Sequence, residues 1–436
     1  MIDFLFGLSF LVFPIALIYL LHCARVDLTK INISNFLLLN LFVFSYLGIL
    51  PLFYKLDSYR VEMGVTSTET LLYLYFFSML SLSFFVLGLI CASRVIVFSG
   101  RKYVAFAEKD RLIFFIMVST IPLFAITLYT YVFSLKSVAL FIALQLVSGD
   151  AAVSRGEMSN GYEGYHWFKM INQDFLIFML LWSYIKAYSN AHFKSIFYIL
   201  LGMATFSVML TTEKAPFIWM FAALSLVRYI LTSEGTAKIG SILAFLGFSL
   251  IALTIFYASF MGMGFDRLGD AFLSIFSRLF AGSIQPAYYY LEYFSVNNYL
   301  LGSSFPNPGA ILPFNHFYLT QEIMQFVKPE SNIQGSMPTV FWGEAYANFG
   351  PMGIIFFSFF IAFFLKCVDN YFDVKMLSSL GLALYIWIIF HFKDLSVTGF
   401  SQYIVDDYFL SILVAYTLMR YLIFRKINDG SPSNAH

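Results

Sequence analysis

The sequence predicts an all-α, polytopic integral membrane protein with about eleven transmembrane helices, folded as a single membrane domain over residues 1–436. Three observations predict this fold class. Hydrophobic residues make up 60% of the chain and charged residues 12%, about half the charge of a soluble domain. The apolar residues gather in stretches of about 20, and basic residues sort to alternate loops between them. This pattern excludes a soluble enzyme, a nucleic-acid-binding protein and a disordered chain.

Eleven stretches have the length and apolar content of a transmembrane helix. Each is expected to be helical, because the bilayer interior offers no other partner for backbone N–H and C=O groups. In chain order they are 4–23, 35–54, 71–92, 112–134, 171–188, 195–212, 215–232, 240–262, 351–369, 376–392 and 402–424. A further apolar run, 138–147, is too short to span and is expected to be interfacial or re-entrant.

The charges between the spans predict their orientation. When all eleven spans alternate in direction, one side holds 16 of the 26 lysines and arginines but only 7 of the 25 acidic residues. Because basic residues concentrate in cytoplasmic loops, this side is expected to be cytoplasmic. The N-terminus is then exterior and the C-terminus cytoplasmic. Cys23, Cys91 and Cys367 all fall near cytoplasmic ends of spans, so no structural disulfide is expected.

The two long loops, 135–170 and 263–350, both lie on the exterior side, and the second is expected to carry amphipathic helices. The cytoplasmic loops are short, and the sequence contains no Walker A or G-x-G-x-x-G motif. Nucleotide-dependent chemistry on the inside is therefore not expected. No cluster of histidines, cysteines or acids has metal-ligand spacing, so neither a metal nor another cofactor is expected.

Loop 135–170 contains one arginine in a glycine-rich, turn-forming segment. Arg155 lies close in sequence to Asp150, Glu157 and Glu163. Pairing with these acids would make it an ordinary solvated residue. Alternatively, its planar fork of donors is suited to a phosphate group on a membrane-anchored ligand.

A tight exterior connection, 211–219, is a second candidate site. A threonine at its start can cap the next helix, and Pro216 suits the first helical turn. Lys214 then sits at the positive end of a helix, a combination that binds anions. The alternative is a lysine that extends its charge to the membrane surface, paired with Glu213.

Residues 265–298 are predicted to form an amphipathic interfacial helix that is interrupted near Pro286. Arg267 and Arg278 are eleven residues apart, which places them on one helix face, and both are candidate phosphate ligands. The segment also holds four tyrosines that are expected to act as interfacial anchors, with sugar stacking as the alternative. They are Tyr288, Tyr289, Tyr290 and Tyr293.

The most distinctive segment is 335–353, GSMPTVFWGEAYANFGPMG, which leads into the span expected to begin at Pro351. Glu344 would lie at or just inside the exterior membrane face, where an acid is costly and is by default a functional candidate. We therefore consider it a candidate general base, with a packing salt bridge to Arg278 or Arg155 as the alternative. Trp342 and Tyr346, on either side of it, are candidate sugar-binding residues.

Two further exterior residues complete the set. Lys393 and Asp394 adjoin a membrane edge and belong either to the same charged cluster or to a solvated turn. His316 is a second candidate base, although a lone histidine is more often structural.

In its layout and in several of these segments, the chain resembles the bacterial O-antigen polymerases, which join oligosaccharide repeat units. Segment 335–353 is similar to a small-Pro-Thr-aromatic-Gly-Glu-x-Tyr-x-Asn-Phe-Gly signature of that family. The long exterior loop before the last three spans, the Arg155–Gly156 pair and a basic residue, Lys214, that opens a span extend the likeness.

The resemblance implies a GT-C-type glycosyltransferase fold in the bacterial inner membrane, with a periplasmic N-terminus and a cytoplasmic C-terminus. Substrates would be undecaprenyl-diphosphate-linked oligosaccharides, joined at the periplasmic face by transfer of the growing chain to a new lipid-linked unit. Membrane lipids and a chain-length regulator are the other partners that it implies, and nucleic acid is not one. The diphosphate and sugars would bind Arg155, Lys214, Arg278, Arg267, Lys393, Tyr346 and Trp342, and the base would be Glu344 or His316.

Two alternatives come from neighbouring classes. An O-antigen ligase, or another glycosyltransferase that uses lipid-linked sugars, would share the layout and differ in its acceptor. A flippase or polysaccharide transporter would require charges along mid-span cavities or broken membrane helices, and the sequence predicts neither.

Overall fold

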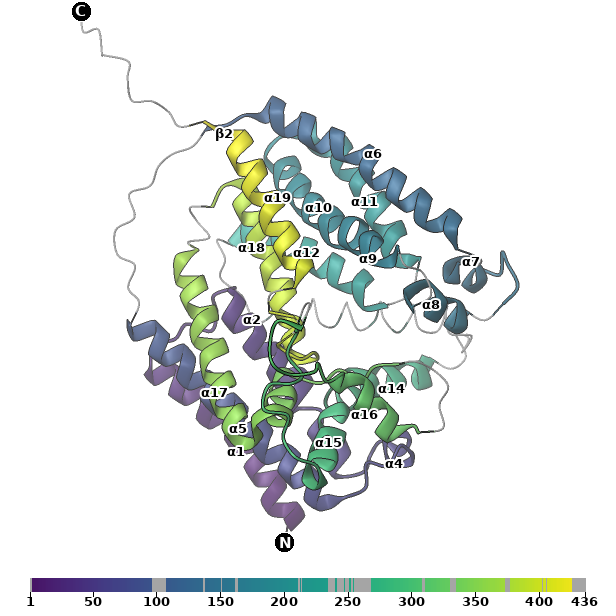
Figure 1. The fold of residues 1–436 in the computed structure, drawn as a ribbon. Coiled ribbons are helices and arrows are strands. Elements are labelled where there is room, and N and C mark those ends of the chain that lie inside the picture. Colours follow the sequence, from purple (N-terminus) through teal and green to yellow (C-terminus); the bar gives the residue numbers. More distant parts are fainter. Residues whose placement is uncertain are drawn as a thin grey trace, which may run out of the picture. The chain divides into compact units, whose positions relative to one another are not determined.

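The computed structural model describes residues 2–95, 107–135, 138–149, 151–160, 164–210, 212, 214–233, 240, 247, 251, 254, 268–307, 310–329, 335–372, 377–401, 403–404 and 406–425. These residues are almost entirely helical (Figure 1). The chain divides into two units, each assembled from segments that are far apart in sequence. Unit 1 comprises Met1–Phe98, Thr236–Tyr371 and His391–Asp406, and unit 2 comprises Ser99–Gly235, Phe372–Phe390 and Asp407–His436.

Unit 1 contains long apolar helices from both ends of its sequence and shorter helices from the segment between them. Its elements are α1 (Ile2–Cys23), α2 (Ile33–Asn40), the π-helix η1 (Leu41–Tyr46), α3 (Ile49–Phe53), α4 (Ser58–Glu62), α5 (Thr68–Val95), α14 (Leu268–Leu279), α15 (Ala281–Val296), α16 (Leu319–Val327), α17 (Phe341–Tyr371) and the 3₁₀-helix η7 (Lys393–Ser396).

Unit 2 is a second group of helices with one short strand pair. Its elements are β1 (Ala107–Glu108), α6 (Asp110–Ser134), α7 (Ala139–Ala143), α8 (Ala151–Asn160), α9 (Tyr165–Phe168), the π-helix η2 (Lys169–Phe175), α10 (Leu176–Ser189), the 3₁₀-helix η3 (Ala191–Phe193), α11 (Lys194–Met209), α12 (Lys214–Ser233), nearly all of α18 (Ser379–Phe392), α19 (Asp407–Ile423) and β2 (Phe424–Arg425).

Seven helices in the described part of the chain are long and apolar enough to cross a membrane, as expected for a helical multi-pass protein. They are Ile2–Cys23, Ile33–Phe53, Thr68–Arg94, Asp110–Ser134, Ala191–Met209, Ala215–Ser233 and Phe341–Tyr371. The first six match predicted spans to within four residues at each end. The seventh, α17, begins at Phe341 but is interrupted at Gly350, so its second part begins at Pro351 as predicted, whereas the helical part before the break was not predicted.

The other four predicted spans have no such helix in the described residues. The stretch 171–188 is built from η2 and α10, and most of 240–262 lies outside the described residues. Helices α18 and α19 have 14 and 17 residues, shorter than the roughly 20 of a full crossing. The count of eleven spans therefore stays a prediction.

Helices α5 and α17 form the principal packing contact of unit 1, and small residues bring them together. A Cβ atom on Gly88 would collide with the carbonyl oxygen of Phe359 and lie 3.0 Å from Ala362 Cβ. The hydroxyls of Ser81 and Ser358 hydrogen bond across the same interface at 2.9 Å. Both features require the two backbones to approach closely.

Substitution of Gly88 by alanine is expected to lower the free energy of unfolding by ~1–3 kcal/mol, because the added methyl group forces the two helices apart. The check is the midpoint of thermal unfolding of the purified protein in detergent. Gly202→Ala is the matched control: Gly202 lies in α11 and has open space where its Cβ would be. An unchanged midpoint for Gly88→Ala would contradict the close packing.

Within each unit, segments that the charge pattern assigns to one side of the membrane contact one another. In unit 1, the Asp369 carboxylate at the end of α17 accepts hydrogen bonds from the N–H groups of Ile33 (2.9 Å) and Ser34 (3.0 Å) at the start of α2. These three residues all belong to predicted cytoplasmic ends. The carboxylate thus satisfies two first-turn donors of α2.

Unit 2 shows the same grouping. Lys186 Nζ lies 3.1 Å from Glu108 Oε2 and 2.5 Å from Asp110 Oδ1, and Ser379 Oγ donates to Glu108. Strands β1 and β2 pair antiparallel beside them, with Glu108 opposite Phe424. All of these segments were assigned to the cytoplasmic side.

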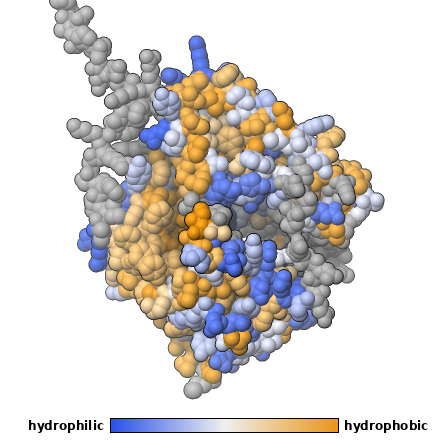
Figure 2. All heavy atoms as spheres, in the orientation of Figure 1, coloured by the Kyte–Doolittle hydropathy of each residue, from blue (hydrophilic) through white to orange (hydrophobic). Residues whose placement is uncertain are grey.

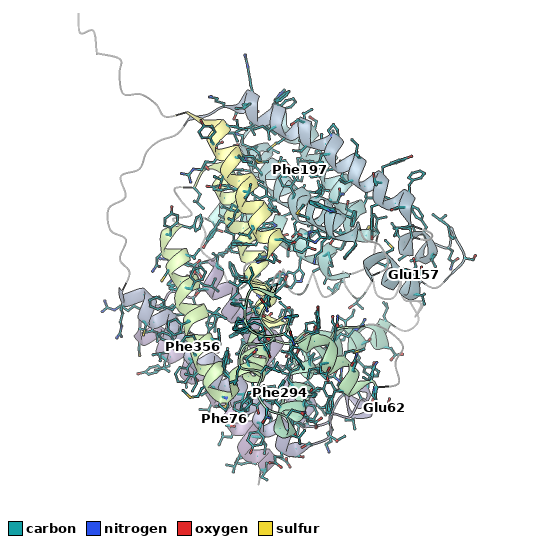
Figure 3. The ribbon with its side chains drawn as sticks, in the orientation of Figure 1. Glu62, Phe76, Glu157, Phe197, Phe294 and Phe356 are labelled. Carbon is teal, nitrogen blue, oxygen red and sulfur yellow. The ribbon has the colours of Figure 1, made fainter. Side chains whose placement is uncertain are left out.

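Apolar residues remain exposed on the long helices, as a lipid-facing surface requires (Figure 2). Phe76 of α5 and Phe356 of α17, both labelled in Figure 3, are 55% and 53% exposed. In Figure 2, hydrophilic residues gather instead over the region that α16 occupies in Figure 1.

The region predicted as one interfacial helix, 265–298, needs two corrections. The helix is interrupted at Phe280 (φ −96°, ψ −72°), between α14 and α15, and Pro286 is accommodated inside α15. Three of the four tyrosines of α15 are not interfacial anchors, since Tyr288, Tyr289 and Tyr290 are 0–3% exposed. Of the two helices, α14 keeps an exposed apolar face, which includes Phe272 and Phe276.

Candidate functional site

The candidate site lies at the N-terminal end of α17, which is broken into two parts. Gly350 has φ 62° and ψ −153°, a conformation that favours glycine and interrupts the helix. The part before the break, 341–349, is almost completely buried in unit 1. The sequence had not predicted a broken helix, and the segment predicted as exterior loop is helical here.

The Glu344 carboxylate sits in this buried part, is 6% exposed and is surrounded by hydrogen-bond donors. Its Oε1 accepts from Ser304 Oγ at 3.1 Å and from the hydroxyl of Ser401, and its Oε2 accepts from the Ser401 N–H at 3.0 Å. No lysine, arginine or histidine side chain in the described part of the chain forms an ion pair with it. The packing salt bridge considered above is therefore absent from that part of the chain.

Asn348, one helical turn after Glu344, holds the same loop in place. Its Nδ2 donates to Ser304 Oγ at 2.8 Å and to the Glu344 carbonyl at 2.9 Å, and its Oδ1 accepts from the Gly302 N–H at 3.0 Å. Because residues four apart share a helix face, the Glu-x-x-x-Asn spacing brings both side chains to Ser304.

Glycine is required where the carboxylate meets the segment before Ser401. A Cβ atom on Gly399 would collide with Glu344 Oε2 and lie 3.0 Å from its Cδ. The chain therefore approaches the carboxylate as closely as a backbone can, and this approach positions the Ser401 N–H to donate.

His316 is connected to this cluster through the backbone. Its Nδ1 lies 2.9 Å from the carbonyl oxygen of Phe305, the residue after Ser304. Because a carbonyl oxygen only accepts, Nδ1 carries the proton, and Nε2 is the basic nitrogen of the neutral ring. The ring is half-buried and packs edge-on against Tyr318.

Lys393 and Asp394 lie in η7 and form an ion pair. Lys393 is 5% exposed, and η7 packs against α2 and η1, so the solvated turn considered above is wrong. Tyr403 donates its hydroxyl to Asp394 Oδ2 at 2.8 Å, and its ring stacks on His391 at 4.5 Å. The pair is compensated by this further hydrogen bond, which a buried ion pair needs.

The two aromatic candidates on α17 are also placed. Trp342 is fully buried, and its Nε1 donates to Ser45 Oγ at 3.1 Å. Tyr346 is 8% exposed and packs against Phe77 and, edge-on, against Tyr299. Both rings contribute to the core beside Glu344.

A second polar cluster joins α4 to α15 and was missed by sequence reasoning. The Arg60 side chain is 12% exposed, pairs with Asp57 at 3.6 Å and donates to Gln285 Oε1. The Gln285 Nε2 donates to the Tyr289 hydroxyl at 2.6 Å. A short hydrophilic loop gave no signal that its arginine would be buried by α15.

Burial also sets the ionisation of α15. It raises the pKa of Tyr288 to about 12, and the N–H groups of Thr66 and Ser67 donate to that hydroxyl at 3.3 and 3.0 Å. Burial raises the pKa of Glu292 above its usual range as well, although its hydrogen bond with Tyr288 opposes the shift. The tyrosines of α15 are therefore neutral hydrogen-bonding groups at physiological pH.

The predicted cations are distributed as follows. Arg278 lies on α14 in unit 1 and is exposed, whereas Arg267 lies outside the described residues. Arg155 lies in α8 and Lys214 opens α12, with Pro216 in the first turn as predicted, and the side chains of both cations lie outside the described part.

Arg155 and Lys214 belong to unit 2, where His166 makes two contacts with the start of α19. His166 pairs with Asp407 at 3.0 Å, and its Nδ1 lies 3.1 Å from the Tyr408 hydroxyl. In unit 1 the Glu344 carboxylate accepts from Ser304, and His316 contacts the carbonyl oxygen of the next residue, Phe305.

The sequence motif identified Glu344 but not the residues that hold it. Ser304 and Ser401 lie 40 and 57 residues from Glu344, and serines at that separation carry no local signal. Asn348 was within the motif and could have been selected, because its spacing from Glu344 is one helical turn.

Chemically, the cluster can hold a carboxylate in one orientation and present it to a hydroxyl group. A bound alcohol that replaced the Ser304 or Ser401 hydroxyl would lie within proton-transfer distance of Glu344. Among the described residues, no group of three or more histidines, cysteines or acids is arranged to hold a metal ion.

A scan against protein-family models, a search of curated proteins and a search of solved structures each gave no match to this chain.

Proposed function

We propose that this protein is an O-antigen polymerase, which joins undecaprenyl-diphosphate-linked oligosaccharide repeat units at the periplasmic face of the inner membrane. The observation that carries the proposal is the buried Glu344 carboxylate within a segment that resembles the family signature, in a chain with several apolar helices. The exterior placement of the long loops by charge counting supports the same assignment.

In this reaction Glu344 accepts the proton of the acceptor hydroxyl on the incoming lipid-linked unit. The oxygen of that hydroxyl forms a bond to the anomeric carbon of the growing chain. The bond from that carbon to the carrier diphosphate breaks, and the diphosphate leaves with the electron pair. A direct displacement of this kind inverts the anomeric centre and needs no second carboxylate as a nucleophile.

The leaving diphosphate requires hydrogen-bond donors and positive charge. Arg278, in unit 1, is the first candidate, since its side chain is exposed. Arg155, Lys214, Arg267 and Lys393 are the other proposed contributors. His316 is the alternative base, because its Nε2 is the basic nitrogen when Nδ1 donates to Phe305.

The test is the lipopolysaccharide banding pattern of a strain that lacks the gene. Deletion is expected to leave the lipid core with a single repeat unit, and the wild-type gene should restore the full ladder. A core that carries no repeat unit would mean that ligation or flipping has failed, which contradicts polymerisation.

One observation favours a rival. The helix break at Gly350 is of the kind found in transporters, which favours a flippase. The sequence had not predicted this break. An O-antigen ligase would act with the same carboxylate. Both rivals predict a bare core on deletion, whereas the polymerase predicts a core with one repeat unit.

A further inference from the structure

Four hydrogen-bond donors without a partner lie together where α17 begins. The backbone N–H groups of Val340, Phe341 and Trp342 make no hydrogen bond within the described part of the chain, and these residues are 0% exposed. The hydroxyl of Thr339, a residue that is 1% exposed, also has no partner there. We call Thr339–Trp342 the α17 donor cluster.

The donors cannot turn away to find other partners, because their neighbours are fixed. The Met337 N–H donates to the Thr320 carbonyl at 2.8 Å, and the Met337 carbonyl accepts from the Tyr290 hydroxyl at 3.1 Å. On the other side, the Gly343 N–H donates to the Val340 carbonyl at 2.8 Å. The segment is therefore held by α15, α16 and its own first turn.

The Thr339 side chain lies against this first turn. A Cβ atom on Gly343 would be 2.6 Å from Thr339 Cγ2 and 2.9 Å from Thr339 Oγ1. The glycine thus makes room for the threonine beside the helix start, where the N–H groups point outward along the axis. The hydroxyl and the positive helix end together form a site for an acceptor oxygen.

Leaving buried donors unpaired is costly, because each group loses its hydrogen bonds to water and gains none in return. A single water accepts only two hydrogen bonds, fewer than the four donors. A phosphate group has three strongly accepting oxygens and matches a helix start with an added hydroxyl. The acid on the same segment, Glu344, lies one turn along the helix. Its carboxylate already accepts hydrogen bonds from Ser304 and Ser401, so it does not serve as the acceptor for these four donors.

We propose that the α17 donor cluster binds the phosphate oxygens of a diphosphate. This assignment rests on the proposed function, in which that diphosphate is the leaving group on the lipid carrier. The cluster then holds the leaving group about one helical turn from the base, where the broken helix places its positive end. The half-helix 341–349 supplies both the donors and the carboxylate.

The experiment measures binding of two probes to the purified full-length protein in detergent, by isothermal titration and by shift of the unfolding midpoint. The probes are inorganic pyrophosphate and farnesyl diphosphate. Wild type is expected to bind at least one of them, and Thr339→Val is expected to weaken that binding about tenfold, because it removes one hydrogen bond to a charged group.

Two control variants and a comparison of the two probes make this result specific. Thr339→Ser keeps the hydroxyl and should bind like wild type, which shows that a loss in Thr339→Val is not a folding defect. Thr417→Val removes an exposed hydroxyl on α19 in unit 2 and should leave affinity unchanged. Tighter binding of farnesyl diphosphate than of pyrophosphate would identify a lipid-linked ligand, and equal binding would show that the diphosphate alone is recognised.

The proposal is overturned if wild type binds neither probe, or if Thr339→Val binds as tightly as wild type. This outcome is distinct from failure of the proposed function. Diphosphate binding that depends on Thr339 in a protein whose deletion leaves a bare core would keep the site and remove the polymerase assignment. A deletion strain with one repeat unit on its core, together with a protein that binds neither probe, would keep the polymerase assignment and remove the site.

Discussion

Replacement of Glu344 by glutamine is expected to abolish the lipopolysaccharide ladder while the protein stays in the membrane. Loss of a general base slows such reactions by about 10²–10⁴-fold, which is enough to leave single repeat units. The amide N–H₂ group of glutamine would also face other donors, because the Ser401 N–H and hydroxyl both donate to the carboxylate of Glu344. The measurement is banding in the deletion strain, with membrane levels checked by blot.

Two variants separate catalysis from packing at this position. Glu344→Asp keeps the charge and should retain part of the ladder if a carboxylate is needed. Glu62→Gln makes the same change on the exposed end of α4, labelled in Figure 3, and should leave banding unchanged. A full ladder from Glu344→Gln at normal protein levels would exclude Glu344 as the base.

Replacement of Arg278 by alanine is expected to abolish the ladder without changing the unfolding midpoint. The side chain is exposed, and no ion pair involving it is found among the described residues, so its loss removes no internal contact that packing depends on. Loss of one group that stabilises charge in the transition state costs about 10²–10³-fold in rate. Banding and thermal unfolding of the same purified variant check both halves of this expectation.

The control for Arg278 is another exposed cation of unit 1. Lys328 follows α16 and is exposed, so Lys328→Ala removes a positive charge from the same predicted side. If both variants weaken the ladder equally, the effect is one of general surface charge. If Arg278→Ala keeps the ladder, the arginine is not a diphosphate ligand.

Hydropathy predicted the long helices well because lipid imposes one simple requirement, a continuous apolar run. It predicted the part of α17 after Gly350 but missed the helical part before it, because Pro351 is typical of a helix beginning and 341–349 lies ahead of it. The break itself falls at Gly350, and a single glycine in an apolar stretch does not reveal its φ angle. A Cβ atom on this residue would lie 2.9 Å from the Tyr299 ring, so a residue more than 50 positions away restricts the position to glycine.

The tyrosines of α15 were predicted to be exposed at the membrane interface, but most of them are buried. Aromatic residues in an exterior loop are typical of interfacial anchors, and sequence alone favoured that role. In the structure their hydroxyls find partners inside unit 1, as Tyr289 does with the Met63 carbonyl at 2.7 Å and Tyr290 with the Met337 carbonyl. Partners more than 40 residues away decide whether such a ring is buried, and no local pattern reports them.

The candidate site was predictable only in part for the same reason. Glu344 stood out because an acid at the edge of a span is costly and its sequence context is unusual. The donors that satisfy it come from residues 304 and 401, on separate segments. Of the predicted cations, Arg278 and Lys393 are described in unit 1, the first exposed and the second buried and paired with Asp394, and no ion pair joins either of them to Glu344 among the described residues. The buried Arg60 had not been considered.

The division into discontinuous units has a consequence for biosynthesis. Unit 1 needs residues up to 406, and unit 2 needs α19, so neither is complete until the ribosome has passed residue 406 or residue 423, respectively. Glu344 is synthesised 57 residues ahead of Ser401, and during that interval its carboxylate lacks two of its donors. Truncation before residue 401 is therefore expected to leave an uncompensated acid for quality control to recognise, rather than a smaller folded protein.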